Sequence, residues 1–143
     1  MLGALIGLLF TAAGGICSWR YMYNPCEVDD VKEASDFLVS QLKSYDGQYQ
    51  FTTTVYPNGL AAPVSVLQRI YVDTQTVDVP VCMRTAKKEL TDYMGTIITA
   101  FQAFGAGEDN AKIRELLGQS DRHYLNFKKE LQAVNECAPF CFR

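Results

Sequence analysis

The clearest pattern in the chain is a helical spacing of apolar residues in its second half. From Pro80, apolar side chains recur every three or four positions up to Phe104, which predicts a helix of about 25 residues. Residues 105 to 107 end this helix, and Asp109 is placed to cap a second one in which the same spacing continues to Cys137. Because the connecting loop is short, we expect an antiparallel helical hairpin.

A third helical pattern precedes this hairpin. Asn24 is placed to cap it, Pro25 suits the first helical position, and apolar residues from Val28 to Tyr45 recur at about helical spacing. Gly47 then follows as a stop. The acidic residues of the first turn are explained by favourable interaction with the helix dipole, so we expect no catalytic or metal-binding role for them.

Between these helical patterns lies a segment with a different period. Residues 48 to 55 alternate between two sets of side chains, rich in aromatic and β-branched residues, which predicts a strand followed by a turn at residues 56 to 59. Residues 60 to 72 fit either a returning strand or a short helix opened by Pro63. We favour a small β-hairpin, because a lone strand would leave its backbone groups unpaired.

The first nineteen residues have no charged side chain and suggest targeting to a membrane. A retained helix of this length spans about 28 Å, close to the hydrocarbon thickness of a bilayer. A cleaved signal peptide would instead end before Ile16, after the small residues Ala13 and Gly15. Lipidation of Cys17 is a weaker alternative, because Ile16 stands where a lipobox needs a small residue. We favour the retained anchor.

Side chains in and after this segment suit an anchor that packs against other helices. Trp19, Arg20 and Tyr21 would lie at the membrane interface, where aromatic residues and a cation are favoured. Gly3 and Gly7 form a GxxxG motif, which allows close approach of a second helix. We therefore expect membrane lipid around residues 1 to 19 and other protein subunits as partners.

Delivery to a periplasmic, extracellular or equivalent oxidising compartment favours disulfides between the cysteines of the domain, whereas a cytosolic chain would keep them reduced. Cys82 and Cys137 lie at the open end of the predicted hairpin, so we favour pairing them and joining Cys26 to Cys141. The alternative pairs Cys26 with Cys82 and Cys137 with Cys141. A zinc site on Cys26, Cys137 and Cys141, with His123, is less favoured because a CxxxC spacing is uncommon in structural zinc sites.

Composition and missing motifs exclude several function classes. The chain has 13 Lys and Arg residues and 16 Asp and Glu residues, which gives a net charge of -3. Because the cations are also scattered along the sequence, we expect no nucleic-acid partner. His123 is the only histidine and is expected on a polar face or boundary, and no nucleotide-binding or hydrolase motif occurs. We expect no enzymatic activity, cofactor or metal. Phe101, Phe104, Tyr124 and Phe127 are interpreted as core rather than as the lining of a ligand cavity.

The sequence thus predicts a mainly α protein with an apolar segment at residues 1 to 23 and a single domain at residues 24 to 143. In that domain, one helix and a long antiparallel helical hairpin would be stapled by two disulfides, with a possible small β-hairpin. We expect a non-enzymatic interaction or accessory subunit of a membrane or cell-surface assembly, with its domain on the exported side. A soluble exported carrier of a small apolar ligand, secreted after cleavage of the leader, and a filament subunit are the alternatives.

Overall fold

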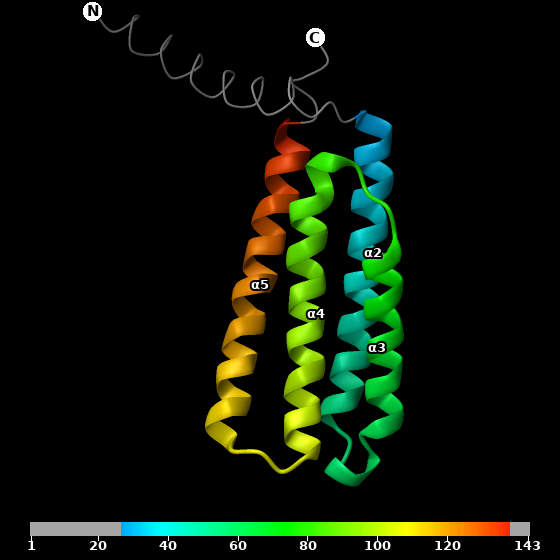
Figure 1. The fold of residues 1–143 in the computed structure, drawn as a ribbon. Coiled ribbons are helices and arrows are strands. Elements are labelled where there is room, and N and C mark those ends of the chain that lie inside the picture. The colour runs from blue at the N-terminus through cyan, green and yellow to red at the C-terminus, as the bar shows by residue number, and fades with distance from the viewer. Residues whose placement is uncertain (1–26, 138–143) are drawn as a thin grey trace, which may run out of the picture.

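The computed structural model describes residues 27–137, which form a bundle of four long helices (Figure 1). Successive helices run in opposite directions, and no strand occurs within this range. Two short 3-10 turns complete the connections between them. In chain order the elements are α2 (Val28–Thr53), η1 (Pro57–Gly59), α3 (Ala61–Thr76), η2 (Val81–Met83), α4 (Arg84–Gly105) and α5 (Asn110–Cys137).

The predicted helical hairpin is confirmed by α4 and α5, which lie side by side along their length (Figure 1). Gly107 has a φ of 72°, a left-handed conformation that is easy for glycine and strained for other residues, and it makes the tight turn after α4 possible. The Asp109 carboxylate accepts a hydrogen bond of 3.1 Å from the Ala111 N–H, as a cap should. The turn and cap that the sequence predicts therefore set the ends of both helices.

The predicted strand at residues 48 to 55 is wrong, because α2 continues through Gly47 to Thr53. The residues that face the core here, Tyr45, Tyr49 and Thr52, follow a helical spacing, whereas Phe51 and Thr53 are exposed. In the helix Tyr49 packs against Phe101 of α4, with ring centroids 5.8 Å apart. The buried Thr52 hydroxyl donates to the Gln48 carbonyl oxygen at 2.7 Å, so its burial leaves no unpaired polar group. Packing on α4 thus outweighs the strand preference of this segment.

Residues 60 to 72 adopt the helical alternative, so the favoured β-hairpin is wrong here as well. Pro63 lies in the first turn of α3, where its missing N–H breaks no intrahelical hydrogen bond. Leu60, Val64 and Leu67 are buried, at the spacing of one helical face. The turn predicted at residues 56 to 59 is present and contains η1.

The start of the first domain helix also differs from expectation. α2 begins at Val28, with Glu27 in an extended conformation at its N-cap, rather than at Pro25 with Asn24 as cap. No side-chain hydrogen bond caps this end. Asp29 and Asp30 lie in the first turn, as predicted, where their charge favours the helix dipole.

One continuous apolar core joins the helices. Leu38, Leu67 and Leu90 from three different helices are fully buried, and Phe127 of α5 is 1% exposed. The buried hydroxyls of Thr52, Thr74 and Ser120 do not interrupt this core, because each donates to a carbonyl oxygen of its own helix, as Ser120 does to Leu117 at 2.7 Å. Mutual burial of apolar surface is therefore the main force that holds the bundle together.

Several predicted features lie outside the described residues, and no helix within residues 27–137 is long and apolar enough to cross a membrane. The predicted anchor and its packing residues remain predictions, as do the disulfides. Cys82 is half-buried against the core. The predicted residues whose side chains are outside the described part are Gly3, Gly7, Trp19, Arg20, Tyr21, Cys26, Cys137 and Cys141.

Candidate functional site

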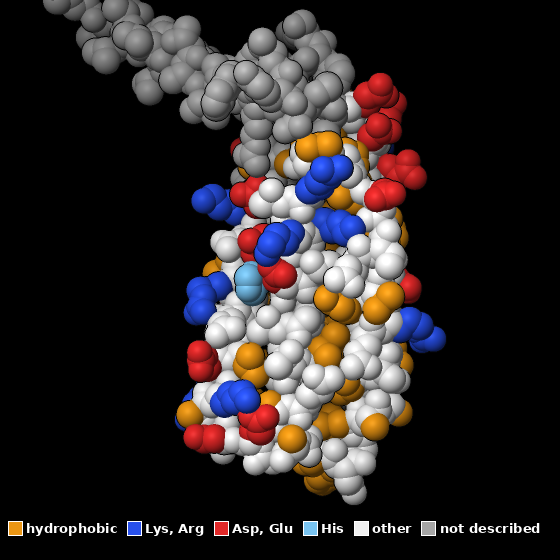
Figure 2. Space-filling view, viewed as in Figure 1, with side chains coloured by type: hydrophobic (Ala, Val, Ile, Leu, Met, Phe, Trp, Pro, Cys, Tyr) orange, Lys and Arg blue, Asp and Glu red, His pale blue; other side chains and the backbone are white. Residues whose placement is uncertain are grey.

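A groove of about 620 Å³ runs along α4, between α3 on one side and α5 on the other. Small residues of α4, among them Gly95 and Thr99, form its floor. Tyr71 of α3 and His123 of α5 line its two sides. A Cβ at Gly95 would lie 3.5 Å from the Tyr71 ring, so this glycine keeps the floor low beside the tyrosine. The pale-blue histidine in Figure 2 marks the α5 side of the groove.

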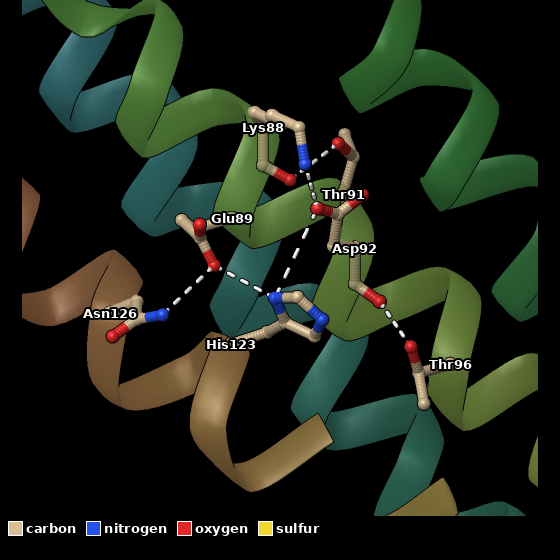
Figure 3. Close-up of polar contacts among 7 residues, drawn as sticks. All are labelled: Lys88, Glu89, Thr91, Asp92, Thr96, His123 and Asn126. Carbon is tan, nitrogen blue, oxygen red and sulfur yellow. Dashed lines mark hydrogen bonds and ion pairs between the residues drawn. The ribbon is translucent and has the colours of Figure 1, made fainter. Parts of the chain in front are cut away.

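A cluster of ionisable side chains lies beside this groove, formed by Glu89 and Asp92 of α4 and His123 of α5, and two of them, Asp92 and His123, line the groove (Figure 3). Residues three apart on a helix share a face, which places both carboxylates toward α5. The His123 Nδ1 atom lies 2.8 Å from Glu89 Oε2 and 4.0 Å from Asp92 Oδ2. One ligand atom from each of the three residues falls within 4.8 Å of the others.

Two neighbouring side chains hold the carboxylates of this cluster. Asn126 donates from Nδ2 to Glu89 Oε2 at 3.4 Å, and the Lys88 ammonium pairs with Asp92 Oδ2 (Figure 3). The side chains of Glu89 and Asp92 are 18% and 34% exposed, respectively, so the cluster is partly shielded from water yet reachable from the groove.

His123 is half-buried at the boundary between α4 and α5, as the sequence predicts, but its carboxylate partners were not predicted. The hairpin register contains the missing signal. His123 and Glu89 both lie seventeen residues from Ala106 in the turn, so an antiparallel hairpin centred there sets them opposite each other. The three acidic or imidazole groups are thus brought together by topology rather than by a local motif.

A second polar network ties α2 to α4 inside the bundle. The buried Tyr45 hydroxyl donates to the Met94 carbonyl oxygen at 2.7 Å, and the Tyr93 hydroxyl donates to Asp46 Oδ1 at 2.9 Å. Burial raises the pKa of Asp46, and the hydrogen bond from Tyr93 partly opposes this. Burial is also the main reason why the pKa of both tyrosines lies above its ordinary value. These phenols therefore stay protonated donors, suited to fixing helix positions.

The end of the bundle that carries η1 is formed in part by two long segments without charged side chains, with Glu108 and Asp109 in the turn beside them. Residues 47 to 68 and 93 to 107 contain no Asp, Glu, Lys or Arg, and the helix directions bring both segments to the end that carries η1 (Figure 1). A Cβ at Gly105 would lie 3.7 Å from the Leu60 side chain, so the two segments lie side by side. We call this surface the uncharged end. It exposes Phe51, Tyr56 and Phe104 by 58%, 82% and 42%.

In Figure 2 the lower right of the molecule, where α3 begins, shows no red or blue side chains. Such side chains appear at the lower left, beside the turn that leads to α5. The aromatic residues expected to form core are divided accordingly. Phe127 is buried, Phe101 and Tyr124 pack against the core, and Phe104 is exposed. Phe101, Tyr124 and Phe127 thus fill space inside the bundle, whereas Phe104 contributes to its surface.

The opposite end of the bundle contains the one predicted disulfide residue whose side chain the structure describes. Cys82 lies in η2, which contacts both α2 and α5 where the described residues begin and end. The side chains of Cys26 and Cys137 lie outside the described part, so both pairings considered for Cys82 remain predictions.

Comparisons with known proteins assign the chain to no family. No protein-family model matches it, and neither a curated protein nor a solved structure does. What the protein does has to follow from its own residues and contacts.

Proposed function

We propose that this chain is a non-enzymatic interaction or accessory subunit of a membrane or cell-surface assembly. Residues 1 to 19 would anchor it, its domain would lie on the exported side, and its uncharged end would dock on another subunit. The observation that carries the proposal is the exposure of Phe51, Tyr56 and Phe104 on a surface formed by segments without Asp, Glu, Lys or Arg.

The physical basis is the cost of removing water from an interface. Covering a charged side chain is expensive unless it gains a partner, whereas covering an aromatic ring is favourable. The centres of protein interfaces are accordingly poor in charge and rich in Tyr and Phe. Tyr56 is 82% exposed, so most of its ring would gain from burial under a partner. The uncharged end has the composition of an interface centre.

The position of the uncharged end supports display from a membrane. α2 starts at Val28, close to the predicted anchor in the sequence, and its 26 residues give a rise of about 39 Å. The uncharged end lies where α2 finishes (Figure 1). An anchored bundle would therefore hold this surface away from its own point of attachment, where another subunit can reach it.

Disulfides would suit such a domain. The end of the bundle that contains Cys82 is also where residue 27 enters and where α5 ends, so bonds from Cys82 to Cys26 or Cys137 would close the bundle near the anchor. A soluble carrier of an apolar ligand is less well supported, because Phe127 and Tyr124 occupy the core rather than line an open cavity.

The experiment is native gel electrophoresis of detergent-solubilised membranes from the cells that make the protein. The wild-type chain is expected in a complex larger than a monomer. Phe51→Asp combined with Tyr56→Asp is expected to shift at least about nine-tenths of it to monomer size, because two desolvated charges at an interface centre cost several kcal/mol. This double variant and the wild type should both remain in the membrane fraction.

The matched control is Val39→Asp combined with Leu125→Asp. These residues are 46% and 63% exposed on the sides of α2 and α5, away from the uncharged end, and the pair introduces the same two charges. It should leave the complex intact. A monomeric wild type, or equal loss of complex in both double variants, would refute docking through the uncharged end.

A further inference from the structure

The cluster at the groove has the composition of a metal site. We propose that Glu89, Asp92 and His123 bind a divalent transition-metal ion, with Zn²⁺ as the best match. The three side chains come from two helices and offer one nitrogen and two carboxylate oxygens within 4.8 Å of one another, and Asp92 and His123 line the groove. This inference is independent of the uncharged end.

The separations from His123 to the two carboxylates bracket those expected around a single small ion. Zinc binds nitrogen and oxygen at about 2.0 to 2.2 Å, so ligand atoms around one tetrahedral ion lie about 3.3 to 3.6 Å apart. The distances from His123 Nδ1 are 2.8 Å to Glu89 Oε2 and 4.0 Å to Asp92 Oδ2, one shorter and one longer than that. Small side-chain rotations would equalise them without moving either helix.

The donor atoms decide the class of metal. An imidazole nitrogen suits Zn²⁺ and neighbouring transition metals, whereas Ca²⁺ and Mg²⁺ prefer oxygen ligands alone. Two carboxylates would balance the charge of a divalent ion. With three protein ligands, a fourth position would stay open toward the groove, where water can complete the coordination.

Two neighbours would act on the ligands from the second shell of contacts. Asn126 already holds Glu89 Oε2 and would keep this carboxylate turned toward His123. Lys88 pairs with the same Asp92 oxygen that faces His123, so its ammonium competes with the ion. The Lys88 side chain is 69% exposed and can swing into water when metal binds.

The ligands stand on a rigid support. Leu90 and Met94 of α4 are fully buried beside them in sequence, and Phe127 of α5 is 1% exposed one turn after His123. These residues belong to one core cluster that fixes α4 against α5. Side chains projecting from such a support start close to their binding geometry, which lowers the ordering cost of metal binding.

The test uses the full chain in detergent, labelled with isotopes at histidine only. Since His123 is the only histidine, its ring gives one set of NMR signals, and metal bound by cysteines alone would leave these signals unchanged. Titration with ZnCl₂ should shift these signals to saturation at one ion per chain. Glu89→Gln and Asp92→Asn should each weaken binding by at least about tenfold, the effect seen even for groups that only support a ligand.

Lys88→Gln separates a metal site from a plain ion-pair cluster. Removing the competing ammonium should tighten Zn²⁺ binding by about two- to fivefold, in line with the strength of an exposed ion pair. Lys112→Gln removes a similar pair, with Glu108, elsewhere on the hairpin and should leave the affinity unchanged. Signals that never saturate, or equal affinities in wild type, Glu89→Gln and Asp92→Asn, would overturn the proposal. An unchanged affinity in Lys88→Gln would remove Asp92 from the ligand set.

Discussion

Phe127→Ala is expected to lower the free energy of unfolding by about 3 to 5 kcal/mol. The Phe127 side chain is 1% exposed, lies in α5, and belongs to the same core cluster as Leu90 and Met94 of α4. Its removal would leave a cavity at the contact that holds the hairpin together, because packed neighbours relax only in part. Urea unfolding followed by circular dichroism measures the change as a shift of the midpoint at constant slope.

Leu125→Ala is the matched control for this measurement. Leu125 lies two residues before Phe127 on the same helix but is 63% exposed, so its truncation should change stability by less than about 0.5 kcal/mol. Equal losses in the two variants would mean that α5 presents a different face to the core. The packing of α5 described above would then be incorrect.

Cys82→Ser is expected to lower the free energy of unfolding by about 3 to 5 kcal/mol. A disulfide from Cys82 to either Cys137 or Cys26 would close a long loop and so restrict the unfolded chain. The variant also identifies the partner. Alkylation followed by peptide mapping should find a newly reactive thiol at Cys137 if the favoured pairing is right, or at Cys26 if the alternative is. Either result would support an oxidising compartment.

Cys17→Ser is the control for this prediction, since Cys17 belongs to neither predicted pairing. It should change neither the stability of the domain nor the reactivity of the other cysteines. If Cys82→Ser instead unfolds like wild type and exposes no new thiol, the two-disulfide interpretation fails.

The helical hairpin could be predicted because its signals agree with one another. α4 and α5 each bury apolar residues at a spacing of three or four over many turns, and a strand cannot satisfy that period. Gly107 and Asp109 then mark the turn through backbone freedom and capping, which are local effects. Long periodic segments with capped ends leave few alternatives.

The secondary structure of residues 48 to 72 was harder to predict from the sequence, because the local and tertiary preferences of this segment conflict. Tyr49 and Phe51 fit an alternating strand, yet Tyr49 finds its partner on α4 only when α2 continues as a helix. Gly47 resembles a helix stop but occurs inside α2. A single glycine costs a helix about 1 kcal/mol, which the packing of several neighbouring residues outweighs.

The two proposed binding surfaces were visible in the sequence only in part. The uncharged runs at residues 47 to 68 and 93 to 107 can be counted directly, but only the bundle topology brings them to one end. Likewise, Glu89 and Asp92 look like ordinary polar-face residues until the hairpin register sets His123 against them. Long-range juxtaposition, rather than residue type, creates both surfaces.

Display of this bundle from a membrane in an oxidising compartment underlies both the proposed docking role and the predicted disulfides. Its most direct test is intact mass spectrometry of the native protein after thiol alkylation, with membrane and soluble fractions measured separately. We predict the full chain of 16.0 kDa in the membrane fraction, with four of its five cysteines unreactive. A full-length chain dissolved in the cytosol, with all five cysteines alkylated, would contradict it.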